Sequence, residues 1–199
     1  MKKNVFLAII FIILACTSTP KLSPLPPDAV VLAFGDSITH GTGAEPEQSY
    51  PAVLSSLISR TVVEAGIPGE VASEGLLRLP QFLDTHKPAL LILCHGGNDM
   101  LRRLGDEQAA DNIRAMIRLA RDRNVKVVLI GVPKLSITLS TAKFYKKIAD
   151  EFKIPYDGNI LNKILKDNSL KADEIHPNAL GYRLLAESVA ELLRKSGAI

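Results

Sequence analysis

The feature that most constrains the fold is an alternation of short apolar runs with segments of helical periodicity. The runs have the composition of fully buried strands, and they occupy residues 30–34, 61–63, 89–94 and 125–130, with a weaker run near 154–156. Apolar residues recur at three- and four-residue spacing over residues 48–58, 73–83, 106–121, 139–152 and 178–195. Strands that alternate with helices need crossover connections, so the chain is predicted to form one three-layer α/β/α domain around a mostly parallel sheet.

The size and charge of the chain narrow the classes of function. Its 199 residues, of which 47% are hydrophobic, suffice for one domain with a single core. The formal net charge is only +3, and nucleic-acid binding normally needs a clustered basic face, so we expect no nucleic-acid partner. Cys16 lies beside a cleavage-like signal and Cys94 ends an apolar run, so the two cysteines do not resemble a disulfide framework.

The N-terminus has the pattern of an export signal. Two lysines, Lys2 and Lys3, precede an apolar run over residues 5–15, which is shorter than the roughly 20 residues that a spanning helix needs. The run ends in Ile-Leu-Ala-Cys at Cys16, which resembles the lipobox of bacterial lipoproteins. The alternative is a plain secretory peptide followed by a chance cysteine.

We therefore predict a signal peptide over residues 1–15, a lipidated Cys16 that opens a Pro/Ser-rich tether over residues 16–28, and a folded domain over residues 29–199. Acyl chains on Cys16 would anchor the mature protein in a membrane, because each buried methylene contributes about 0.8 kcal/mol. The expected location is the bacterial cell envelope, facing the periplasm or the exterior.

Polar side chains occur where the predicted strands end. Ser37 follows the first strand, in the sequence VVLAFGDSIT, and Asn98 follows the third, in LCHGGND. Gly69 lies in the loop after the second strand and could turn its amide N–H toward Ser37. In parallel sheets, reactive groups gather outside the carboxyl ends of the strands, so these residues are expected at one edge.

Asp173 and His176 lie immediately before the last predicted helix, in ADEIHPN. A neutral imidazole can take a serine proton near pH 7, and a nearby carboxylate can orient it. Each of these fragments alone is weak, because a Gly-rich turn, a helix cap or a surface histidine would explain it equally well.

Together and in this order, the fragments FGDSIT, AGIPGE, GGND and DEIHPN resemble the SGNH, or GDSL-type, hydrolase family over about residues 29–193. Within that family the chain is most similar to the bacterial thioesterase I/lysophospholipase/arylesterase group. The resemblance implies a flavodoxin-like sandwich with strand order 2-1-3-4-5. It also implies that Ser37 is the nucleophile, His176 the base and Asp173 its orienting acid, with Ser37, Gly69 and Asn98 forming the oxyanion hole.

The resemblance implies a serine esterase that acts on acyl esters such as lysophospholipids or aryl esters through an acyl-enzyme. We expect the enzyme to be a monomer that needs no cofactor. An acyl thioesterase and a carbohydrate O-acetylesterase would use the same site. A non-catalytic lipid- or glycan-binding lipoprotein of the same fold is a further alternative. Two positions depart from the resemblance: relatives often carry Asn at Glu64, and close relatives carry other residues at His95.

Other chemistries have weaker support. Ser140 and Lys143 fit a Ser-x-x-Lys pattern, but the companion fragments of penicillin-recognising enzymes are missing and residues 139–152 fit a helix. No Gly-x-Ser-x-Gly elbow occurs. His40, His86 and His95 lie apart from one another and from His176 without metal-like spacing, so no metal site is predicted.

Overall fold

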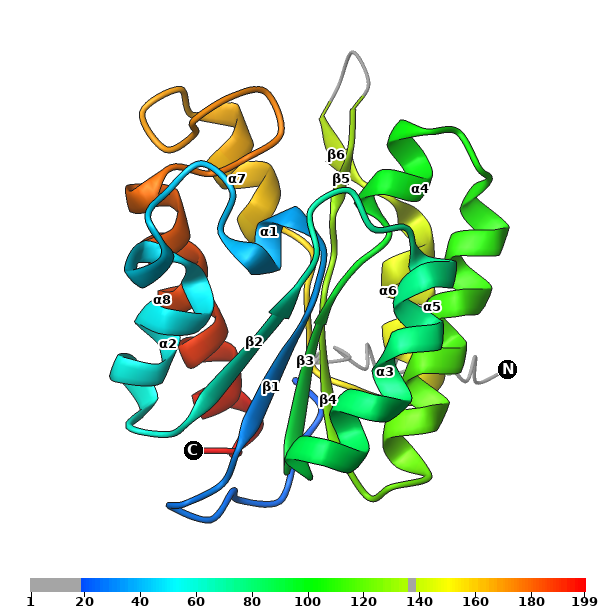
Figure 1. Cartoon of the computed structure of the whole chain (residues 1–199), viewed down its shortest axis with the longest axis vertical. Coiled ribbons are helices and arrows are strands. Elements are labelled where there is room, and N and C mark those ends of the chain that lie inside the picture. Colours follow the sequence, from blue (N-terminus) through cyan, green and yellow to red (C-terminus); the bar gives the residue numbers. More distant parts are fainter. Residues whose placement is uncertain (1–18, 136–138) are drawn as a thin grey trace, which may run out of the picture.

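The computed structural model describes residues 19–135 and 139–199, so the predicted signal peptide and Cys16 lie outside the described residues. Its centre is a five-stranded parallel sheet in the order β2-β1-β3-β4-β7 (Figure 1). The strands are β1 (Val31–Gly35), β2 (Val62–Gly66), β3 (Leu90–Cys94), β4 (Lys126–Ile130) and β7 (Tyr156–Asp157). Because β7 is the fifth strand of this sheet along the chain, the predicted order 2-1-3-4-5 is confirmed.

Helices cover both faces of the sheet and complete the predicted α/β/α sandwich (Figure 1). One layer contains α2 (Tyr50–Ile58), α7 (Ile160–Lys166) and α8 (Ala179–Ser196), and the other contains α3 (Ala72–His86), α5 (Asp106–Arg121) and α6 (Lys143–Phe152). All residues of β1 and β3 are buried between these layers. Burying one large aliphatic side chain contributes about 1.5–3 kcal/mol, so the two central strands form the most strongly stabilised part of the core.

Several short elements were not predicted. The helix expected over residues 139–152 begins only at Lys143, because β6 (Ser140–Thr141) instead pairs antiparallel with β5 (Pro133–Lys134). Three short helices are also new: α1 (Ser37–His40), η1 (Pro46–Gln48) and α4 (Gly97–Leu101). The helix α7 was missed as well.

The segment predicted as a tether is described from residue 19 onward, and there it packs on the domain. Leu25 is buried, and the backbone N–H groups of Leu22 and Leu25 donate to the carbonyls of Ser196 and Ala198 at 2.8 Å each. The folded unit therefore begins several residues before the predicted position 29. None of the helices in residues 19–135 and 139–199 has the length and apolar character that crossing a bilayer requires.

The pairing of β1 with β3 places the two polar sequence fragments side by side. Gly35 pairs with Cys94 at the carboxyl ends of these adjacent strands. Asp36 and Ser37 follow β1, and His95 to Asn98 follow β3, so both segments leave the sheet at the same edge.

Candidate active site

Ser37 lies where β1 leaves the sheet and α1 begins. Only glycine fits at position 35, because a Cβ there would lie 2.0 Å from the carbonyl oxygen of Cys94. Asp36 is buried and caps α1, its carboxylate accepting from the N–H of Ile38 at 3.2 Å, and burial raises the pKa of this carboxyl. As the first residue of a helix, Ser37 has no intrahelical acceptor for its own N–H. Its hydroxyl and its N–H are thus both available to a ligand.

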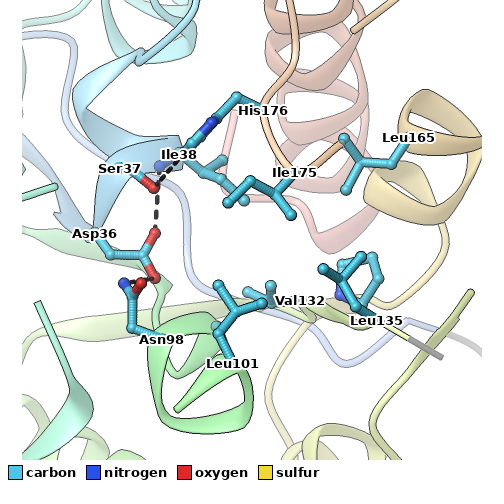
Figure 2. A pocket seen from close by; sticks show the side chains of 12 residues that line it. Asp36, Ser37, Ile38, Asn98, Leu101, Val132, Leu135, Leu165, Ile175 and His176 are labelled. Atoms are coloured by element: carbon cyan, nitrogen blue, oxygen red, sulfur yellow. Dashed lines mark hydrogen bonds between the residues drawn. The ribbon is translucent and has the colours of Figure 1, made fainter. Parts of the chain in front are cut away.

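His176 and Asp173 form a continuous hydrogen-bonded chain with Ser37. The Nε2 atom of His176 lies 3.0 Å from Oγ of Ser37, and its Nδ1 atom lies 2.8 Å from a carboxylate oxygen of Asp173 (Figure 2). A carboxylate can only accept, so Nδ1 carries the proton and Nε2 is left to accept the serine hydroxyl. This is the geometry in which a base activates a serine.

The loop that carries His176 holds its own acid in place. The second carboxylate oxygen of Asp173 accepts from the backbone N–H groups of Ile175 and His176 at 2.8 and 2.9 Å. Desolvation opposes the ionisation of Asp173, but these bonds and the bond from the imidazole outweigh it, so its pKa lies below the ordinary value. Asp173 is therefore an anion at neutral pH and can stabilise an imidazolium.

Asn98 faces the same space from α4, and Gly69 lies in the adjoining turn. The amide Nδ2 of Asn98 donates to the carbonyl of Glu70 at 2.9 Å and, more weakly, to Asp36 at 3.4 Å. Gly69 has a left-handed backbone with φ of +82°, and among the described residues its N–H has no hydrogen-bond acceptor. Ser37, His176 and Asn98 line one pocket, whereas Gly69 is not part of its lining. Gly69 is connected to the pocket through its neighbour Glu70, whose carbonyl accepts from Asn98.

The rest of the lining of this pocket is mostly apolar (Figure 2). Its side chains come from α1, from α4, from the β5 region, from α7 and from the His176 loop, and they are Ile38, Leu101, Val132, Pro133, Leu135, Leu165 and Ile175. The polar groups are confined to one side of the pocket. A ligand with a polar reacting centre and an apolar substituent would match both sides.

Comparison with known proteins identifies the family. A model of the GDSL-like Lipase/Acylhydrolase family matches residues 33–184. The chain belongs to this family. The SGNH resemblance seen in the sequence is thereby confirmed, and the GDSL-like chain is a serine ester hydrolase.

Individual relatives of this GDSL-like hydrolase span most of its length. It is 30% identical to an arylesterase of Vibrio mimicus over 83% of this chain and 88% of the relative. It is 28% identical to thioesterase 1/protease 1/lysophospholipase L1 of Escherichia coli K12, over 82% of this chain and 83% of the relative. The crystal structure of TesA superposes with a TM-score of 0.75 at 29% identity, covering 83% of this chain and 98% of TesA.

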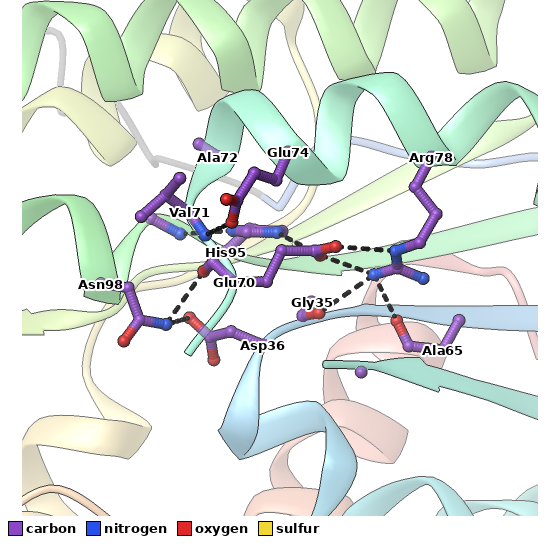
Figure 3. A network of polar contacts seen from close by, with 12 residues as sticks. Gly35, Asp36, Ala65, Glu70, Val71, Ala72, Glu74, Arg78, His95 and Asn98 are labelled. Atoms are coloured by element: carbon purple, nitrogen blue, oxygen red, sulfur yellow. Dashed lines mark hydrogen bonds and ion pairs between the residues drawn. The ribbon is translucent and has the colours of Figure 1, made fainter. Parts of the chain in front are cut away.

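The hydrolase also contains a buried polar network that the sequence did not reveal (Figure 3). The carboxylate of Glu70 accepts from Arg78 through Nε at 2.9 Å and Nη2 at 2.7 Å, and it lies 3.1 Å from Nε2 of His95. Although desolvation opposes ionisation, the hydrogen bonds from His95 and Arg78 lower the pKa of Glu70 to about 2. The half-buried Arg78 lies among the apolar residues of α3, which is a signal in the sequence, but that signal does not identify Glu70 or His95 as its neighbours.

The remaining histidines and the rival serine lie elsewhere. His40 is exposed, His86 ends α3, and His95 is fully buried in the network rather than in the pocket. Ser140 lies on β6, so the Ser-x-x-Lys fragment is not the helical segment that was expected. In the part of the chain that the structure describes, no group of three or more His, Cys, Asp or Glu side chains could hold a metal ion.

Proposed function

We propose that this protein hydrolyses carboxylic esters with an acyl chain, using Ser37 as nucleophile, His176 as general base and Asp173 as the orienting anion. The observation that supports the proposal is the hydrogen-bonded chain from Asp173 through His176 to Ser37, which ends in a pocket with an apolar wall. A pure binding module has no need for such a chain.

In the first step Oγ of Ser37 bonds to the carbonyl carbon and its proton passes to Nε2 of His176. The carbonyl oxygen becomes an oxyanion, which the N–H groups of Ser37, Gly69 and Asn98 stabilise in this proposal. The ester bond then breaks as the alcohol takes the proton from His176, leaving an acyl-enzyme. Water repeats the sequence on the acyl-enzyme, with the same histidine taking and returning its proton, and releases the acid.

The apolar wall favours substrates with an acyl chain over acetylated sugars, because an acetyl group would leave most of that wall uncovered. Thioesters use the same steps, and one relative is named a thioesterase and lysophospholipase. A panel of p-nitrophenyl esters from acetyl to palmitoyl, together with a lysophospholipid and an acyl-CoA, would rank these classes by kcat/KM.

The decisive test is Ser37→Ala, with Ser140→Ala as the matched control on the rival serine. We expect Ser37→Ala to lower kcat on a short p-nitrophenyl ester by at least ~10³-fold without loss of fold, whereas Ser140→Ala keeps wild-type kcat. A fluorophosphonate should label the wild-type serine only. Wild-type protein that is neither active nor labelled would favour the binding-module alternative, and an active Ser37→Ala variant would reject the assignment.

We further propose that Cys16 is lipidated and that the protein works from the membrane of the bacterial envelope. The support for this proposal is the sequence pattern of residues 1–16.

A further inference from the structure

The two turns that carry the proposed oxyanion donors Gly69 and Asn98 are bound to each other. Nδ2 of Asn98 donates to the carbonyl of Glu70, and Nη2 of Arg102 donates to the carbonyl of Gly69 at 2.7 Å. The N–H of Ala72 donates to Asp99 at 2.8 Å. Three hydrogen bonds therefore connect the turn after β2 to the turn after β3, so a displacement of one turn would also shift the donor carried by the other.

His95 lies behind this unit and is held at three points. Its carbonyl accepts from the hydroxyl of the buried Tyr145 at 2.7 Å, and its Nδ1 atom accepts from the N–H of Gly96 at 2.9 Å. Because Nδ1 accepts, the proton of the neutral ring is on Nε2, which donates to Glu70 at 3.1 Å. The ring is fully buried, so no water replaces these partners.

The carboxylate of Glu70 is shared between two elements. Arg78 approaches it from α3, and His95 approaches it from the end of β3 (Figure 3). There is no spare volume beside the ring, because a Cβ on Gly75 would lie 2.4 Å from Nε2 of His95 and 3.2 Å from the Glu70 carboxylate. Without the His95 bond, Arg78 would draw Glu70 toward α3 alone, and the carbonyl that orients Asn98 belongs to the same residue.

We propose that His95 is a positioning residue for the oxyanion hole, acting through the Glu70 carboxylate to hold the turns of Gly69 and Asn98 at their working distance from Ser37. This inference rests on the proposed esterase function. His95 touches neither substrate nor nucleophile in this scheme. Its loss should affect the transition state, in which the oxyanion forms, more than the binding of substrate.

Two substitutions of similar polarity separate the bonds of the His95 ring. In His95→Gln the amide nitrogen lies near the position of Nε2 and can still donate to Glu70. In His95→Asn the shorter side chain keeps an acceptor near Nδ1 for Gly96 but does not reach Glu70. If His95 acts through Glu70, the glutamine variant should retain kcat and the asparagine variant should not. If its only role is to accept from the N–H of Gly96, the asparagine variant should retain kcat and the glutamine variant should not.

We expect His95→Asn and His95→Leu to lower kcat on a short p-nitrophenyl ester by about 10- to 100-fold, the effect of displacing catalytic groups by a fraction of an ångström to one ångström, with KM changed less than about twofold. His95→Gln should stay within about threefold of wild type. In a double-mutant cycle, adding His95→Asn to Glu70→Ala should cost no further kcat, because Glu70→Ala already removes the acceptor of the His95 bond. Ser196→Ala, which deletes a buried hydrogen bond at the far end of α8, is the control for general loss of packing and should keep wild-type kcat.

The outcomes separate the two proposals. An inactive wild type rejects the proposed function itself. An active wild type with all His95 variants at wild-type kcat, or with asparagine and glutamine equally impaired, overturns the positioning role alone. A change confined to KM overturns it as well. The asparagine and glutamine pair decides the question even where the leucine variant does not fold.

Discussion

At the scale of single residues, the two hydrogens of the Asn98 amide have different roles, one structural and one proposed to be catalytic. One hydrogen of Nδ2 is committed to the Glu70 carbonyl at 2.9 Å, while the other has only the long 3.4 Å contact to Asp36. A donor with a weak partner can turn to a stronger acceptor when negative charge develops nearby. The amide is thus oriented by its first bond and free to use its second.

This division predicts the kinetic phenotype of Asn98. Asn98→Ala should lower kcat by about 10²–10³-fold, as loss of one oxyanion donor does elsewhere, and change KM little. Asn98→Asp keeps the size of the side chain but removes the donor, so it should be equally impaired. Steady-state kinetics on the ester panel would check both variants, and a raised KM with unchanged kcat would contradict the role.

The residues of the site differ in whether the neighbouring sequence is enough to predict them. Ser37, Asp173 and His176 could be singled out because each lies in a short fragment whose neighbours indicate its use. Glu70 and Arg78 could not be predicted in this way, because their hydrogen bonds join a turn, a helix and the end of a strand that are distant in sequence. A charged side chain among apolar residues predicts that it has a hydrogen-bond partner, but only the packing of the helices and strands identifies that partner.

At the scale of elements, Glu70 connects the β2–α3 turn to α3 and to the end of β3. The contribution of these contacts to the free energy of unfolding should depend on pH in the acidic range. The folded-state pKa of Glu70 is about 2, below the ordinary value of 4.5. A lowered pKa contributes stability that is complete above pH 4.5 and is lost as the pH falls toward 2. The contribution at neutral pH is of the order of 3 kcal/mol.

Glu70→Gln should therefore flatten the pH dependence of unfolding. Wild-type protein should lose free energy of unfolding between pH 5 and pH 2 more steeply than the variant, because only the wild type must protonate this carboxylate as it unfolds in that range. Urea denaturation at half-unit pH intervals would measure both curves. Parallel curves over this interval would contradict the prediction, because they would mean that the pKa of Glu70 is the same in the folded and unfolded states.

Helices were predicted correctly where the apolar periodicity extends over several turns. The prediction failed where pairing between strands determines the local structure. The helix α5 has the predicted bounds, 106–121, because four turns of apolar spacing follow a glycine and an aspartate. Residues 140–141 have helical spacing too, but their backbone hydrogen bonds go to β5 across a hairpin. The helices α4 and α7 are too short, at five and seven residues, for a period of 3.6 to stand out.

At the scale of the whole molecule, the N-terminal segment is part of the stabilised fold. Leu25 is 5% exposed, and Arg60 donates to the carbonyls of Leu25 and Pro26 at 3.2 and 3.1 Å. Leu25→Ala should lower the free energy of unfolding by about 2–4 kcal/mol. Leu77→Ala, the same change at a side chain that is 84% exposed, should stay within about 0.5 kcal/mol of wild type. Equal stability of the two variants in urea denaturation would mean that the segment is not docked.

The docked segment also fixes which end of the molecule would face a membrane. Its contacts with Ser196 and Ala198 lie at the edge where the strands begin, and Ser37 lies at the edge where they end (Figure 1). Cys16 and Leu22 are six positions apart, and a chain of that length spans at most about 20 Å. A lipid on Cys16 would therefore hold the protein close to the bilayer, and the docked segment that leads to it lies away from the edge that carries Ser37.

This orientation predicts that anchoring and catalysis are separable. In a bacterial host, Cys16→Ser should move the protein from the membrane fraction to the soluble fraction and abolish palmitate labelling, because acyl chains supply the only proposed anchor. Its kcat/KM on a soluble short ester should remain within about twofold of wild type, since the docked N-terminal segment lies at the edge of the sheet opposite Ser37. Persistence of Cys16→Ser in the membrane fraction would reject the lipid anchor. A large fall in kcat/KM would instead show that the anchored end and the active site are coupled, contrary to their positions at opposite edges of the sheet.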